Sequence, residues 1–110
     1  MMNLIKKAVL TFFMAMSLGA TNVAFAEDAK ATEVIAHIEA ALAEIEKNDF
    51  NAAYLHEKAA REASEQITSN EAVAKQGYQS IIQAQILGKK AETEKAAAEL
   101  NKALGFYKSI

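Results

Sequence analysis

The amino-acid sequence predicts an all-α protein, an antiparallel four-helix bundle made of two helical hairpins. The chain has 110 residues, a length that suits one domain. It has no proline and only four glycines, whereas the tight turns of β proteins depend on both residue types. Its hydrophobic residues, 52% of the chain, recur at spacings of three and four, the period of a helix with one buried face.

The first 26 residues predict a secretory signal peptide. Lys6 and Lys7 form a positively charged start, and the run 8–20 is apolar and uncharged. Ala24 and Ala26 provide the small residues that signal peptidase recognises, so we expect cleavage after Ala26 and export to the periplasm. An uncleaved membrane anchor is the alternative, but a helix over 8–20 spans only about 20 Å of a hydrocarbon core about 30 Å thick.

Residues 27–110 hold four amphipathic segments that pair into two hairpins, at 32–67 and 69–110. The connections between successive segments are short, which makes neighbouring helices antiparallel. The apolar positions of 38–67 align without gaps with those of 81–110, which indicates an internal duplication. The core is expected to be rich in alanine, so the helices can approach closely while each buries little area.

Helix starts are marked by residues that cap a free N-terminus. Thr32 and Asp49 are the expected N-caps of the first hairpin, and Thr68 with Glu71 has the form of a capping box before the third helix. The expected core comprises Ile35, Ile38, Leu42 and Ile45, then Ala52, Ala53, Ala59, Ala60, Ala63 and Ile67 with Leu55 at the edge, then Ala74, Gly77, Tyr78, Ile81 and Ala84, and finally Ala96, Leu100, Ala103 and Tyr107.

Composition excludes several kinds of site. Without cysteine the chain has no disulfide, thiolate zinc site, iron–sulfur cluster or covalently attached haem. All four methionines precede residue 27, so cleavage would also remove the ligands of a methionine-rich copper site or a His/Met haem. The sequence has no HExxH pair, Ser-His-Asp arrangement or glycine-rich phosphate loop, and its carboxylates are expected on solvated faces. An enzyme is therefore not expected.

The charge balance makes nucleic acid an unexpected partner. Once Lys6 and Lys7 are removed, ten basic and fourteen acidic residues remain, and phosphate binding needs a basic surface. The excess of acid lies in residues 27–69, with four basic and ten acidic side chains, whereas residues 70–110 have six and four. The acidic half can attract a cation or help the two hairpins to dock.

The chain has two histidines, and both are candidate metal ligands. His56 falls in the middle of the alanine face of the second helix, so it is expected inside the bundle or lining a gap in it, either as a ligand or as a core histidine with one polar partner. His37 lies at the edge of the first apolar stripe, with Glu33 four residues before it and Glu44 seven after it. Imidazole and carboxylate together suit Zn²⁺, Cu²⁺ or Ni²⁺, and the same residues also suit an ordinary solvated helix face.

The two histidines are expected to be too far apart to share one ion. A turn near Asn48 and Asp49 puts His56 level with about Leu42, five residues from His37. Five residues of helix span about 7–8 Å. Side chains also lean toward the N-terminus of their own helix, which separates an antiparallel pair of this kind further.

Two segments of the first hairpin resemble the repeats of the periplasmic small metal-binding proteins: Glu33–Leu42 (EVIAHIEAAL) and Tyr54–Ala63 (YLHEKAAREA). The resemblance implies an exported four-helix bundle of two similar hairpins that binds copper, nickel and zinc loosely. His37 and His56 fall where that family carries helix-borne histidines. The second hairpin departs from the pattern, because Ser80 and Glu99 stand at the corresponding positions and no histidine follows.

Three functions are open at the level of sequence. The first is weak divalent metal binding or buffering in the periplasm. The second is a non-enzymatic interaction module with an unknown protein partner, since the turn at Asn48–Ala53 is similar to that of tetratricopeptide hairpins. Apolar residues off the expected core faces would then form its binding patch or the seam of a homodimer: Ile82, Ile86, Leu87 and Phe106. The third is an envelope stress holdase. After cleavage, no segment is expected to span a membrane.

Overall fold

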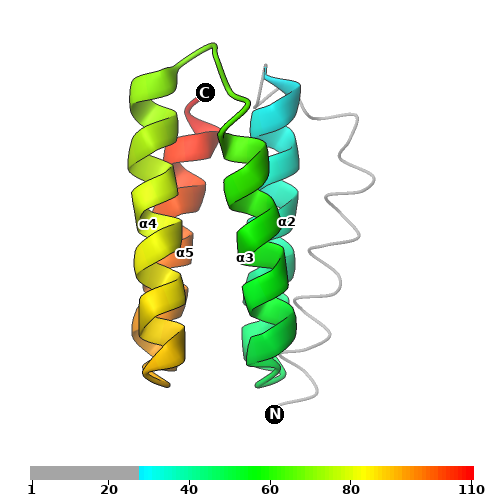
Figure 1. The fold of residues 1–110 in the computed structure, drawn as a ribbon, viewed down its shortest axis with the longest axis vertical. Helices are drawn as coiled ribbons and strands as arrows, with labels where there is room; N and C mark the ends of the chain where they lie inside the picture. The colour runs from blue at the N-terminus through cyan, green and yellow to red at the C-terminus, as the bar shows by residue number, and fades with distance from the viewer. Residues whose placement is uncertain (1–27) are drawn as a thin grey trace.

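The structure, a computed structural model, describes residues 28–110, which form four α-helices. These are α2 (Ala29–Glu46), α3 (Phe50–Ser64), α4 (Glu71–Lys89) and α5 (Thr93–Lys108). Consecutive helices run antiparallel, and α2 with α3 forms one hairpin while α4 with α5 forms the other (Figure 1). The hairpins pack through α2 against α5 and α3 against α4. The all-α bundle of two hairpins is therefore confirmed.

The predicted signal peptide, residues 1–26, lies outside the described residues. Among the helices that the structure describes, none combines the length and apolar character needed to cross a bilayer.

The first described helix begins four residues earlier than predicted. Asp28 is its N-cap, and the Asp28 carboxylate accepts hydrogen bonds from the backbone N–H groups of Lys30 and Ala31 at 2.7 and 3.3 Å. Thr32, the predicted cap, lies inside the first turn. Either residue type can cap a helix, and Asp28 adds four more residues to the helix than Thr32 would.

The predicted cap of the second helix is confirmed, and that of the third is wrong. Asp49 caps α3 by accepting from the N–H of Ala52 at 3.0 Å. The third helix is capped by Asn70, whose side chain accepts from the N–H of Val73 at 3.2 Å. The Thr68 capping box therefore does not form, since asparagine is among the strongest N-caps and adjoins the helix directly.

The two hairpin turns have the same backbone conformation, which supports the internal duplication. Asn48 and Ala91, 43 positions apart, both have φ of 61°. In each turn the N–H of the following residue donates to a carbonyl five residues back, from Asp49 in one turn and from Glu92 in the other, both at 2.9 Å. The helix ends beside the two turns show the same offset of 43. Helices α2 and α4 end at Glu46 and Lys89, and α3 and α5 begin at Phe50 and Thr93.

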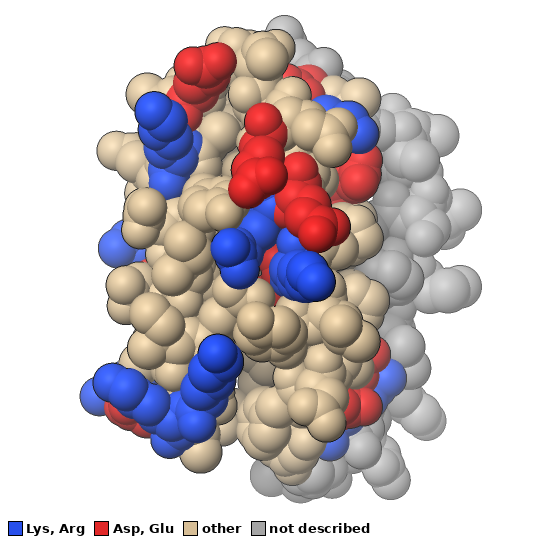
Figure 2. All heavy atoms as spheres, viewed as in Figure 1, with Lys and Arg blue, Asp and Glu red and all other residues tan. Residues whose placement is uncertain are grey.

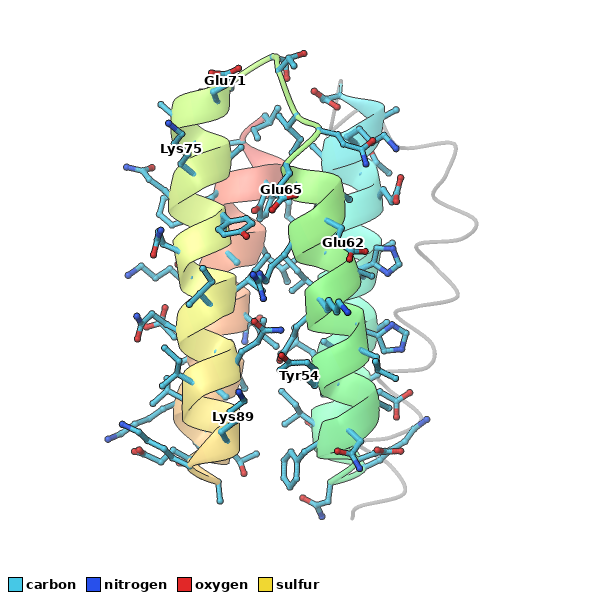
Figure 3. The ribbon with its side chains drawn as sticks, in the orientation of Figure 1. Tyr54, Glu62, Glu65, Glu71, Lys75 and Lys89 are labelled. Carbon is cyan, nitrogen blue, oxygen red and sulfur yellow. The ribbon has the colours of Figure 1, made fainter. Side chains whose placement is uncertain are left out.

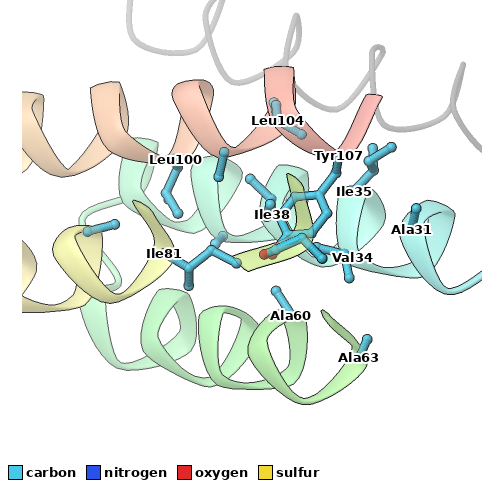
Figure 4. Packing of buried hydrophobic residues seen from close by; sticks show 14 of the residues in the cluster. Ala31, Val34, Ile35, Ile38, Ala60, Ala63, Ile81, Leu100, Leu104 and Tyr107 are labelled. Carbon is cyan, nitrogen blue, oxygen red and sulfur yellow. The ribbon is translucent and has the colours of Figure 1, made fainter. Parts of the chain in front are cut away.

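The core is a single cluster of apolar side chains from all four helices (Figure 4). Its largest fully buried members are Tyr107, Ile38, Ile81, Leu100 and Val34. The Tyr107 hydroxyl shares a hydrogen bond of 2.6 Å with the Ser64 hydroxyl. The Tyr107 ring lies directly over Gly77, where an added Cβ would be 2.5 Å from the ring carbon Cε2. Gly77 is therefore required for this close approach.

The buried face of α3 is rotated from the expected one. Its fully buried positions include Ala53, Glu57 and Ala60, whereas Ala52 and Ala59 are only half-buried and Leu55 is 65% exposed. Alanine is small and tolerates either environment, so a face defined by alanine alone is ambiguous.

The expectation that all carboxylates are solvated is also wrong. Glu39 on α2 and Glu57 on α3 are each only 4% exposed. Burial raises the pKa of each from 4.5 to about 7, because a desolvated carboxylate is disfavoured relative to the neutral acid.

Candidate metal site

The two histidines lie side by side on neighbouring helices. The ring centroids of His37 on α2 and His56 on α3 are 6.3 Å apart, and the ring planes are inclined by 32°. Both residues are half-buried, so of the two expected positions for His56, inside the bundle or lining a gap in it, the first is wrong. The buried Ala53 and Ala60 lie three residues before and four residues after it on the same side of α3, so His56 lies at the edge of the buried face.

The expected separation of the histidines is wrong because the centre of the turn lies about one residue earlier than assumed. Helix α2 ends at Glu46 and α3 begins at Phe50, so the centre of the turn falls at Asn48. His56 is then level with about Ala40, only three residues from His37. That offset corresponds to about 4.5 Å along the helix axis, which two imidazole side chains can span.

Of the two predicted carboxylate ligands, Glu33 is near the histidines and Glu44 is not. The distance from Glu33 Oε2 to His37 Nε2 is 3.9 Å, and the two side chains are 47% and 32% exposed. Glu44 is two turns from His37 along α2 and instead lies 3.9 Å from the ammonium of Lys47. Within residues 28–110, no three Asp, Glu or His side chains already converge on one point.

The histidine pair suits a divalent ion after a small adjustment. With metal–nitrogen bonds of about 2.0–2.1 Å and a tetrahedral angle, two imidazole centroids lie about 5 Å apart. The rings therefore need to approach by about an ångström, within the range of rotamer adjustment. Glu33 can then supply an oxygen ligand, and a water molecule can supply the fourth ligand. Two imidazoles, one carboxylate and one water are the donor set of a weak, exchangeable site.

A second polar site lies between α3 and α4, and sequence reasoning missed it. A pocket of about 400 Å³ is lined by the buried Glu57 and Gln85, together with Phe50, Tyr54, Lys89 and other residues. In the sequence, only the internal duplication could have pointed to these two polar residues. At an offset of 43, Glu57 corresponds to Leu100 and Gln85 corresponds to Leu42.

Gln85 is held in place by Arg61. The guanidinium donates from Nη1 to Gln85 Oε1 at 2.9 Å and from Nη2 to the Tyr78 hydroxyl at 3.2 Å. Tyr78 in turn donates to Glu65 Oε2 at 3.1 Å. These contacts orient the Gln85 amide and leave its buried Nε2 without a hydrogen-bond partner. Inference of function rests on these side chains and the histidine pair, because no protein-family model, curated protein or solved structure matches the chain.

Proposed function

We propose that this is an exported periplasmic protein that binds a divalent transition-metal ion, Cu²⁺, Ni²⁺ or Zn²⁺, weakly and reversibly. The observation that carries the proposal is the 6.3 Å separation of the His37 and His56 rings on adjacent helices. Imidazole nitrogen is a good ligand for all three ions, and two imidazoles fixed on a rigid hairpin bind better than either alone.

Binding is expected to be weak, because the protein offers two imidazoles and at most one carboxylate. Glu33 must rotate away from its present contacts with Lys30 and His37 to reach the ion. A half-exposed site also leaves water in the remaining coordination positions. These properties fit a buffer that takes up and releases metal, rather than a site that retains one structural ion.

The charge of the first hairpin supports cation binding. Acidic side chains outnumber basic ones by ten to four in residues 27–69. Without the buried Glu39 and Glu57, eight acidic side chains remain against four basic ones. This excess of negative charge raises the local concentration of cations near the histidine pair.

Calorimetric titration of the purified protein with each ion tests the proposal. We expect one ion per chain, with affinity reduced roughly tenfold or more by His37→Gln and by His56→Gln, since each variant removes one of two imidazoles. Glu33→Gln should weaken binding less. Glu44→Gln on the same helix is the matched control and should bind like the wild type. Absence of binding at millimolar metal, or unchanged binding by both histidine variants, would refute the proposal.

The alternative function is protein interaction, and the exposed apolar side chains of α3 and α4 favour it. Leu55 and Ile86 are 65% and 41% exposed, and Phe50 and Tyr54 are exposed as well. A protein that binds no metal, and whose sedimentation shows a dimer disrupted by Leu55→Glu, would support this function instead.

A further inference from the structure

The pocket between α3 and α4 contains polar groups that the fold itself does not use. Glu57 is 4% exposed and Gln85 7% exposed, and both line the pocket. Gln85 Nε2 has no hydrogen-bond partner. No hydrogen bond or ion pair within residues 28–110 involves the Glu57 carboxyl group. A buried amide N–H group without a partner is costly, so Gln85 Nε2 beside the Glu57 carboxyl group calls for an explanation beyond folding.

The equivalent positions of the other hairpin interface show how this part of the core is filled when no polar groups are present. Leu100 is fully buried and Leu42 packs against the core, and they occupy the positions equivalent to Glu57 and Gln85. The other hairpin interface therefore closes with two leucines. Here the same two positions present a carboxyl group and an amide to an open pocket of about 400 Å³. That volume lies within the range of small-molecule sites, about 300–1,000 Å³.

One basic side chain, Lys89, lies at the rim of the pocket. Figure 2 shows basic side chains gathered at the lower end of α4, where the helix ends at Lys89. Lys89 and Tyr54 project toward each other from α4 and α3 (Figure 3), and the Lys89 ammonium lies 5.6 Å from the centre of the Tyr54 ring. The pocket thus combines a buried acid, a buried amide donor and a cation at its mouth.

The remaining wall is apolar. Ile45 and Phe50 line the pocket together with Ala53 and Ala96. A ligand that satisfies every group would carry an ammonium for Glu57, an anionic oxygen for the Gln85 amide and Lys89, and an apolar body for this wall. An ammonium alone would leave Lys89 and Gln85 without a partner, and a carboxylate alone would face the Glu57 carboxyl group.

We propose that this pocket binds a free α-amino acid with an apolar side chain. Its ammonium pairs with the Glu57 carboxylate, its carboxylate accepts from Gln85 Nε2 and from Lys89, and its side chain contacts Phe50 and Ile45. The pocket contains no histidine, so this activity is separate from metal binding.

Titration of the unmodified protein with three related probes tests which ligand groups are recognised. The probes are free leucine, 3-methylbutylamine, which lacks the carboxylate, and 4-methylpentanoate, which lacks the ammonium. Binding is followed by the NMR shifts of the Gly88 and Thr93 amides, which line the pocket. We expect leucine to bind roughly tenfold more tightly than either analogue at pH 8, since each lacks one charged contact. Equal affinity of the three probes, or no shift with millimolar leucine, would overturn the proposal.

Two variants test which protein groups hold the ligand. Glu57→Gln should weaken leucine and 3-methylbutylamine but not 4-methylpentanoate, whereas Lys89→Gln should weaken leucine and 4-methylpentanoate but not the amine. Glu39→Gln, at the other buried glutamate, and Lys75→Gln, at an exposed lysine of α4, are the matched controls. If the controls weaken leucine as much as the pocket variants do, the assignment of the site is wrong.

Discussion

Replacement of Glu39 by glutamine should stabilise the protein at alkaline pH and have little effect at acid pH. Glu39 is 4% exposed, and neither carboxylate oxygen has a hydrogen-bond partner. Burial raises the pKa of the Glu39 carboxyl group from 4.5 to about 7, although the positive charge of Lys108 acts in the opposite direction. Glutamine has nearly the same shape and never acquires a charge.

The direction in which stability changes with pH follows from proton linkage. The folded protein binds the Glu39 proton more tightly than the unfolded chain does, so the stability that Glu39 contributes is fully present below pH 4.5. It is lost as the pH rises through about 7, where the buried carboxyl group must ionise. The difference between the two pKa values corresponds to about 3 kcal/mol at pH 8. For a domain of this size, that is a change in Tm on the order of 10 °C.

Urea unfolding followed by circular dichroism at pH 4 and pH 8 measures the effect. Glu39→Gln should match the wild type at pH 4 and be more stable by about 3 kcal/mol at pH 8. Glu46→Gln, at an exposed position on the same helix, serves as the control and should change stability little at either pH. Equal effects of Glu39→Gln at the two pH values would refute the reasoning. A loss of stability at pH 8 would mean that Lys108 compensates the buried charge.

Three further predictions concern backbone positions and are measured by thermal unfolding. Gly77→Ala should destabilise by about 1–3 kcal/mol, because its Cβ would meet the Tyr107 ring at 2.5 Å. Gly105→Ala has open space around the new methyl group and should stabilise by about 1 kcal/mol, so similar Tm values for the two variants would contradict the packing. Ala91→Asn should stabilise by about 1 kcal/mol, because Ala91 has φ of 61° and asparagine, already present at the equivalent Asn48, tolerates that conformation better. A lower Tm for Ala91→Asn would argue against strain at this turn.

The fold could be predicted from the sequence because spacing in the first helix is unambiguous. Ile35, Ile38 and Ile45 are large, apolar and three or seven positions apart, and all three are buried as expected. The expected apolar face of the second helix was defined mainly by alanines. The true buried stripe includes Glu57, which no reading of hydrophobicity would select, so the face was displaced.

The residues of the candidate metal site were proposed from the sequence, and the structure changes the geometry expected for them. His37 and His56 were chosen for their ligand chemistry, and their separation depended on the exact centre of the turn. A shift in that centre by one residue changes the axial offset of an antiparallel pair by about 3 Å, because both helices move. Glu44 was chosen for sharing a face with His37, but two turns of helix place it near Lys47 instead.

The repeated turns at Asn48 and Ala91 have a consequence for what the core can contain. In a bundle assembled from two identical hairpins, any change at one position would occur twice, and a carboxyl group in the core would be desolvated twice. When both hairpins are part of one chain, a substitution in one hairpin is not repeated in the other. Glu57 could therefore enter the core at half the free-energy cost, while its counterpart Leu100 continues to close the opposite interface.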